Sequence, residues 1–263
     1  MTSAGPQRVP PPPSQEELAR MSLLEHLEEL RKRIVRALLA LAAAFIPCWA
    51  YHEEIFAFLQ APLKKDFPNL KLSFLGFTDP FILYFKVAAL AALFLASPFV
   101  LYQLWSFIAP GLYRRERKLA LPFVFFTTAF FLSGGAFGYY VTFPFAAKFL
   151  LGIGKDFQAV ITVEKYFGFL LTVLLGLGLM FELPILILLL SLLGVVTSRF
   201  LLRFWRHAVV LIFVLAAIVT PTPDVVNLCI FAVPALGLYF LGVAAAFVAE
   251  RLRKKRATEL AAE

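Results

Sequence analysis

The sequence predicts an all-α, polytopic membrane protein with six transmembrane helices and both termini in the cytoplasm. Hydrophobic residues make up 61% of the 263 residues, the chain contains 30 Phe, and its mean hydropathy is +0.82. A soluble globular protein carries roughly 45–50% apolar residues, so the excess must face lipid. The apolar residues gather in six runs, at 34–50, 81–105, 119–143, 166–194, 207–219 and 228–249.

The lengths of the runs decide which of them can cross a bilayer. A hydrocarbon core about 30 Å thick needs about 20 helical residues. The second, third, fourth and sixth runs meet this length, and the first meets it narrowly. The fifth run, between Arg206 and Pro221, would span only about 20 Å at 1.5 Å per residue. We therefore expect helices five and six to form a short hairpin that turns at TPTPD, residues 220–224.

The basic residues predict the orientation of the chain. Eighteen Lys and Arg lie in the N-terminal segment, the 106–118 and 195–207 loops and the C-terminal tail, against six in the 51–80 and 144–165 loops. Because cytoplasmic loops carry the excess of positive charge, both termini are expected to be cytoplasmic. The net charge of +8 is thus a topology signal with some attraction to anionic lipid, and it does not indicate nucleic acid.

The N-terminal segment divides into a Pro-rich extension and a helix that leads into the first span. Residues 1–20 contain VPPPPSQ and are expected to be a disordered cytoplasmic extension, with a capping box at Ser14 and Glu17 as a possible helix start. HLEELRKR, residues 26–33, then presents Glu28 and Glu29 beside the membrane. Each acid can pair with a base four residues later on the same helix, which is the simplest explanation for both.

Prolines and glycines shape the middle of the chain. We expect a surface helix in the 51–80 loop to end near Pro62, and an Asp79-Pro80 start for span two. A kink is expected at Pro98, and span three is expected to end at Pro144. Gly134 and Gly138, four residues apart, form a face for close packing against another helix.

Glu182, in FELP, is the acid inside a predicted span, near the middle of span four. An ionised carboxylate at this depth costs at least about 2.5–3.5 kcal/mol on insertion scales, so such acids are typical of functional sites. A hydrogen bond to a carbonyl freed by Pro184 is the structural alternative.

The sequence contains no zinc-binding spacing, HExxH, GxSxG or phosphate-binding loop, and its three His are scattered. We therefore predict no enzyme activity, no metal and no cofactor. Cys48 and Cys229 lie at the outer ends of their helices, and two apolar buried thiols are favoured over a disulfide. The domain prediction is a single membrane domain over 21–250, followed by a basic cytoplasmic tail over 251–263.

Six segments in order resemble the TatC family, the multispanning receptor subunit of the twin-arginine protein translocase. These segments are HLEELRKR, APLKK, FIAPGLYRRERK, FGYYVTFPFAAKF, FELP and TPTPD. The resemblance runs from about Ser22 to Glu250. It implies a receptor in the cytoplasmic (inner) membrane that captures Arg-Arg export signals, assembles with small single-span subunits of the TatA/TatB type, and exports folded proteins with the proton-motive force.

The resemblance also assigns residues. It places signal-peptide binding on Glu29 and Glu116, with Arg31, Phe107, Leu112, Tyr113 and Arg117 shaping the same surface. Pro62 matches the proline of the outer loop, Glu182 the buried intramembrane acid, and Asp224 the acid of the five–six turn. The family often has Ser-Gln where this chain has Asn227-Leu228, so the residues that dock partner subunits stay open, as does the choice between Thr220 and Thr222 for the threonine of that turn.

Apart from the resemblance, carboxylates are chemically suited to binding arginine, because they accept planar, bidentate hydrogen bonds from a guanidinium. Two other classes of function compete. A proton-coupled solute transporter would also use Glu182, although no inverted repeat is visible. A passive scaffold would explain the glycine face but leaves Glu29 and Glu182 without a role.

Overall fold

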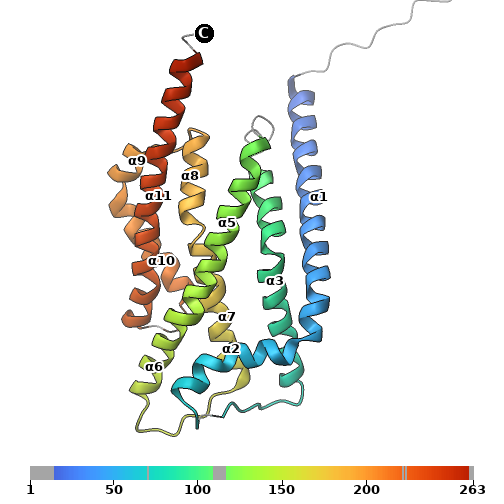
Figure 1. The fold of residues 1–263 in the computed structure, drawn as a ribbon, viewed down its shortest axis with the longest axis vertical. Helices are drawn as coiled ribbons and strands as arrows, with labels where there is room; N and C mark the ends of the chain where they lie inside the picture. Colours follow the sequence, from blue (N-terminus) through green and yellow to red (C-terminus); the bar gives the residue numbers. More distant parts are fainter. Residues whose placement is uncertain (1–14, 70, 109–116, 221, 223, 261–263) are drawn as a thin grey trace, which may run out of the picture.

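The computed structural model describes residues 15–69, 71–108, 117–220, 222 and 224–260, and this part of the chain is built from helices (Figure 1). In chain order the helices are α1 (Gln15–Ala50), α2 (His52–Asp66), α3 (Asp79–Ile108), α5 (Arg117–Phe137), the π-helix η1 (Gly138–Thr142), α6 (Phe143–Ile153), α7 (Val163–Met180), α8 (Leu183–Leu192), α9 (Ser198–Arg203), α10 (Trp205–Val219) and α11 (Val225–Leu260).

Within the described residues, five helical segments are long and apolar enough to cross a membrane. They are His26–Ala50, Asp79–Ile108, Pro122–Ile153, Val163–Leu192 and Val225–Arg251, and the shorter apolar helix α10 makes the sixth. The predicted multi-pass, all-helical fold is confirmed. The start of α1 and the end of α11 lie at one end of the bundle, which we call the terminal end (Figure 1). Helix α2 lies across the opposite end, the α2 end.

Two predicted boundaries are wrong. Span three does not end at Pro144: the chain passes from α5 through η1 into α6, and Pro144 occupies the first turn of α6, where a residue needs no hydrogen-bonded N–H. Helix α2 does not end near Pro62, which lies inside the helix, but continues to Asp66. By contrast, the predicted bend in span four is confirmed. The span divides into α7 and α8 at Phe181 and Glu182, and Pro184 lies in the first turn of α8.

The sixth helix is longer than predicted. α11 runs for 36 residues to Leu260, so only α10 is short, and most of the predicted tail over 251–263 continues this helix. Residues 15–20 are likewise helical, so α1 begins inside the predicted N-terminal extension. Glu250 of α11 accepts hydrogen bonds from the backbone N–H and the hydroxyl of Ser198, which fastens α9 to α11.

Helix α7 packs into the centre of the bundle. Phe167, Leu170 and Leu177 of α7 are fully buried and form one apolar core with residues of α2, α3, α10 and α11. The predicted glycine face is confirmed at the α5–α7 contact. A Cβ atom on Gly134 would lie 2.6 Å from the Leu177 carbonyl oxygen, so only glycine lets these backbones approach this closely.

Two loops meet at the α2 end. Ser73 donates its N–H to the Ile161 oxygen at 2.9 Å and accepts from the Val163 N–H at 2.8 Å. The Asp79 carboxylate accepts from the N–H groups of Leu75 and Gly76, so it stabilises the turn before α3 rather than capping the helix itself.

Candidate functional site

Glu29 lies near the terminal end on α1, in an ion pair with its own helix. Arg33 donates from Nε at 3.0 Å and from its terminal nitrogen at 2.5 Å to the same oxygen of Glu29. The side chains of Glu29 and Arg33 are 33% and 18% exposed, whereas Glu28 and Lys32, paired at 2.7 Å, are 62% and 61% exposed. The predicted pairs are both present. Only Glu29 turns toward the bundle.

An aromatic contact joins this part of α1 to the end of α3. The rings of His26 and Phe107 stack with centroids 4.5 Å apart, and Glu29 follows His26 by about one helical turn. The segment after Phe107 carries Leu112, Tyr113 and Glu116, which lie outside the described residues. Arg31 is exposed, and Arg117 begins α5, where the backbone alone is described. The structure therefore brings the part of α1 that carries Glu29 against the end of α3 that carries Phe107, while Glu116 lies outside the described residues.

Glu182 lies inside the bundle at the junction of α7 and α8. Its carboxylate oxygen Oε2 accepts a hydrogen bond from the Thr127 hydroxyl of α5 at 2.5 Å. The Thr127 oxygen in turn accepts from the indole N–H of Trp105, on α3, at 2.7 Å. All three side chains are buried, at 8%, 0% and 3% exposure for Glu182, Thr127 and Trp105. The partner of the buried acid is therefore a hydroxyl of another helix, not a carbonyl freed by Pro184.

The indole N–H of Trp105 can only donate, so the Thr127 oxygen accepts from it, and the Thr127 hydroxyl can donate its own hydrogen to Oε2 of Glu182. The second carboxylate oxygen, Oε1, is buried and has no hydrogen-bond partner among the described residues.

Pro62 explains a long-range contact at the α2 end. Proline has no N–H, so the carbonyl of Phe58, four residues earlier, lacks its partner within α2. The hydroxyl of Tyr139, from η1, donates to this carbonyl, and the hydroxyl of Tyr166, from α7, donates to the neighbouring Leu59 carbonyl at 2.8 Å. Pro62 therefore acts within the fold, by leaving open an oxygen that ties α2 to η1.

Asp224 caps the first turn of α11. Its side chain accepts from the backbone N–H of Asn227 at 2.7 Å and from the Asn227 amide at 2.9 Å. Partial desolvation favours a higher pKa for Asp224, but hydrogen bonds with Asn227, Thr222 and Val226 together outweigh it and hold the pKa of this carboxyl below its usual value. Asn227, which is fully buried, also donates to the Thr222 hydroxyl at 3.0 Å, whereas Thr220 bonds back to Ala216. Thr222 is thus the threonine of the turn network.

Comparison with known proteins identifies the family. The model of TatC, the Sec-independent protein translocase protein, matches residues 25–234. The chain belongs to the TatC family. TatC of Koribacter versatilis is 48% identical over 256 residues, covering 95% of this chain and 94% of the relative, and TatCy of Bacillus subtilis is 36% identical over 237 residues, covering 89% and 92%. The crystal structure of a twin-arginine translocase receptor, TatC, superposes with a TM-score of 0.76 at 32% identity, covering 86% of this chain and 99% of that one.

This TatC-family protein is thus a multi-pass membrane subunit of a Sec-independent protein translocase. Sequence reasoning located Glu182 but missed Trp105 and Thr127, which lie 77 and 55 positions away along the chain. A single Thr in an apolar run does not indicate a site, because membrane-spanning helices tolerate many such isolated polar residues. Tyr139 lies within the segment FGYYVTFPFAAKF, but its role depends on the carbonyl of Phe58, 81 positions earlier in the chain.

The two cysteines of this TatC-family protein are free. Cys48 is buried, as predicted, whereas Cys229 is partly exposed. The disfavoured disulfide is absent.

Proposed function

We propose that this protein is the signal-peptide receptor of its translocase. Glu29 and Glu116 bind the two arginines of an export signal at the cytoplasmic face, and the complex then exports the folded cargo with the proton-motive force. The partners are small single-span subunits of the TatA/TatB type, together in an oligomeric complex in the cytoplasmic membrane. Family membership and the placement of Glu29 support this proposal.

The observation that carries the proposal is the placement of Glu29 one helical turn from His26, whose ring stacks on Phe107. The stacked pair of His26 and Phe107 holds α1 against the end of α3, from which the segment bearing Glu116 departs. Glu29 and Glu116 belong to two separate elements, so each carboxylate can accept one guanidinium. Arg31, Leu112, Tyr113 and Arg117 belong to the same two elements and complete the proposed surface.

The ion pair of Glu29 with Arg33 does not prevent this role. A partly exposed i,i+4 pair contributes only about 0.3–0.5 kcal/mol, whereas a charge-assisted hydrogen bond to a guanidinium contributes about 1.5–3 kcal/mol. An incoming arginine can therefore displace Arg33 from Glu29 at small cost. In the absence of a signal, Arg33 satisfies the carboxylate.

Binding of a labelled Arg-Arg signal peptide to the full chain in detergent tests the proposal. Glu29→Gln and Glu116→Gln should each weaken binding about 10- to 100-fold, the equivalent of one charge-assisted hydrogen bond. Glu28→Gln is the matched control, because Glu28 lies on the same helix, makes its own pair with Lys32 and is more exposed. A Lys-Lys peptide should bind as weakly to the wild type as the Arg-Arg peptide binds to the variants.

Equal binding of both peptides, unchanged by either substitution, would show that the acids only balance their own helix and loop. We would draw the same conclusion if Glu28→Gln weakened binding as much as Glu29→Gln, because binding would then depend on the overall negative charge of the helix and not on Glu29 itself. Thermal unfolding of each variant separates loss of binding from loss of fold.

Glu182 is proposed to act after capture, at the step that the proton-motive force drives. Glu182→Gln should leave peptide binding within about twofold of the wild type and reduce export of a reporter protein at least tenfold. Glutamine still offers an oxygen to the Thr127 hydroxyl, so the hydrogen-bond chain and the fold are retained. Loss of peptide binding in this variant would contradict the division of roles.

A further inference from the structure

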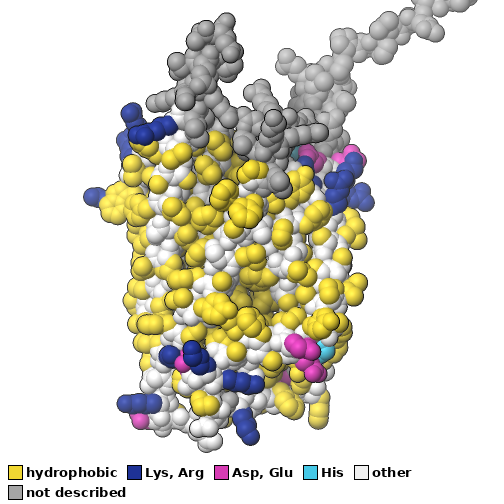
Figure 2. Space-filling view, in the orientation of Figure 1, with side chains coloured by type: hydrophobic (Ala, Val, Ile, Leu, Met, Phe, Trp, Pro, Cys, Tyr) yellow, Lys and Arg dark blue, Asp and Glu magenta, His cyan; other side chains and the backbone are white. Residues whose placement is uncertain are grey.

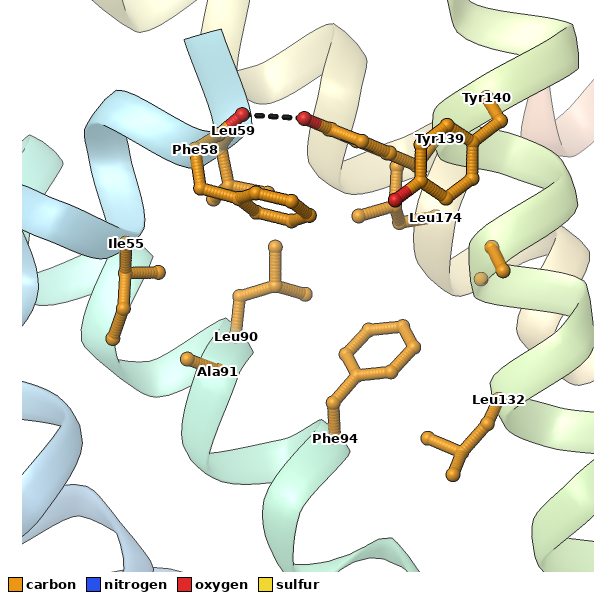
Figure 3. A pocket seen from close by; sticks show the side chains of 12 residues that line it. Ile55, Phe58, Leu59, Leu90, Ala91, Phe94, Leu132, Tyr139, Tyr140 and Leu174 are labelled. Carbon is orange, nitrogen blue, oxygen red and sulfur yellow. Dashed lines mark hydrogen bonds between the residues drawn. The ribbon is translucent and has the colours of Figure 1, made fainter. Parts of the chain in front are cut away.

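An apolar hollow of about 290 Å³ opens between α2 and the membrane-spanning helices beside it (Figure 3). Its walls come from α2, α3, α5, η1 and α7. They include Ile55 and Phe58 of α2, Leu90 and Phe94 of α3, Leu132 of α5 and Leu174 of α7. Phe58 and Leu132 are 54% and 41% exposed, so the hollow reaches the molecular surface. Because α3 and α5 belong to membrane-spanning segments, this surface faces hydrocarbon.

A second hollow, of about 320 Å³, adjoins the first and has a different character. It is lined by Pro62, Lys65 and Asp66 at the end of α2 and by Lys148 of α6. Lys148 pairs with Asp66 at 3.0 Å, and Lys65 is exposed. Two lysines and one aspartate leave this second hollow with a net charge of +1.

Tyr139 and Tyr140 line both hollows and mark the boundary between them. Tyr139 is fixed by its hydrogen bond to the Phe58 carbonyl (Figure 3), and Tyr140 is 68% exposed. Tyrosine is enriched where a membrane protein passes from hydrocarbon to the headgroup region. On the viewed face, hydrophobic side chains cover the middle of the bundle, and charged side chains gather below them toward the α2 end (Figure 2).

We propose that the two hollows form one binding site for an anionic phospholipid. An acyl chain fills the apolar hollow, and the phosphate lies on Lys65 and Lys148 beyond the two tyrosines. The net charge of +1 complements a phospholipid with a single negative charge, whereas a zwitterionic lipid gains less from the site. This site lies at the α2 end and does not depend on the proposed capture of signals at the terminal end.

The preference for anionic lipid must come from the lysines. A lipid tail is already in an apolar environment in the bilayer, so the apolar hollow selects by shape and adds little driving force. Each lysine near an anionic headgroup contributes about 1 kcal/mol, which is roughly a fivefold change in affinity.

Native mass spectrometry of the full chain in detergent, with dioleoyl phosphatidylglycerol and dioleoyl phosphatidylcholine in competition, tests the proposal. The wild type should prefer phosphatidylglycerol. Lys65→Gln/Lys148→Gln should reduce that preference about 5- to 25-fold. Lys64→Gln/Lys155→Gln is the matched control: it removes the same charge from exposed lysines at the same end that line neither hollow, and should leave the preference unchanged.

The apolar hollow is tested separately with Ala136→Phe and Leu132→Trp, which place a larger side chain at its exposed rim. Either variant that keeps the wild-type unfolding temperature should bind both lipids more weakly. Lipid binding like that of the wild type in these variants overturns the proposal. So does an equal loss of preference in the Lys64/Lys155 control, or binding of a single-span peptide in the apolar hollow that lipid fails to displace.

Discussion

At the scale of single residues, the central feature is a buried acid whose surroundings are asymmetric. One oxygen of Glu182 is held by Thr127 and, through it, by Trp105, while the other has no partner among the described residues. The side chain is therefore oriented without being fully satisfied. A carboxyl group that is held through one oxygen while the other has no partner suits an acid that acts within a membrane.

Thr127→Val tests the hydrogen-bond chain. Valine has nearly the same shape as threonine but leaves the buried Trp105 N–H and Glu182 Oε2 without partners. The free energy of unfolding should therefore fall by about 1–3 kcal/mol. The measurement is thermal unfolding in detergent. Thr128→Val is the control, because the Thr128 hydroxyl is buried without a hydrogen-bond partner among the described residues, and its removal should cost nothing. Equal destabilisation by both changes would count against the chain.

At the scale of helices, the contact between α2 and η1 shows how an irregularity is used. Pro62 removes a hydrogen bond from the middle of α2, and the π-helical turn presents Tyr139 to the oxygen that is left. π-helical turns are rare and occur often at functional sites. The two irregularities are coupled, because each would leave a polar group without a partner if the other were absent.

A double-mutant cycle on Pro62 and Tyr139 measures this coupling. Tyr139→Phe alone should lower the free energy of unfolding by about 1 kcal/mol, because the Phe58 carbonyl loses its donor. In a Pro62→Ala background the Ala N–H can bond to that carbonyl, so the same change should cost less than half as much. Thermal unfolding provides the values. Identical costs in the two backgrounds would mean that Pro62 and Tyr139 act independently.

The helices show where sequence reasoning succeeds and where it stops. Apolar runs located every span, because the bilayer imposes a length and a composition on each segment. The local pairs of Glu28 and Glu29 followed from the helical period alone. The partners of Glu182 and Tyr139 could not be derived in this way, since they depend on the packing of helices distant in sequence. Pro144 misled for another reason: a proline near the start of a helix and a proline that ends one look alike in sequence.

At the scale of the whole molecule, the described ends of the chain lie on one side and the surface helix α2 on the other (Figure 1). The distribution of Lys and Arg predicts that the terminal end is cytoplasmic. The α2 end, with the loops joined through Ser73 and Thr162, then faces outward. The proposed sites for signals and for lipid thus belong to opposite sides of the membrane.

Thiol labelling tests this orientation. In a background with Cys48 and Cys229 replaced by alanine, Gln158→Cys at the α2 end should react with an impermeant maleimide added to intact spheroplasts. Arg203→Cys, in α9 at the terminal end, should react only after permeabilisation. Both positions are exposed, so accessibility to the reagent differs only by the side of the membrane. The reverse pattern would invert the topology and remove the cytoplasmic location of Glu29.

The peripheral position of α1 has a consequence for biogenesis. Only 6% of the most apolar stretch of α1 is buried inside the bundle, against 44% of the corresponding stretch of α3. Helix α1 packs mainly on α3 and makes a smaller contact with α2. During synthesis α1 leaves the ribosome before α3 exists, so it must reside in lipid as a solitary helix. Its acids, Glu28 and Glu29, already have partners on their own helix. The acids of the first helix therefore need no partner from another helix before docking, and packing of α1 on α3 then brings Glu29 to the proposed signal-binding surface.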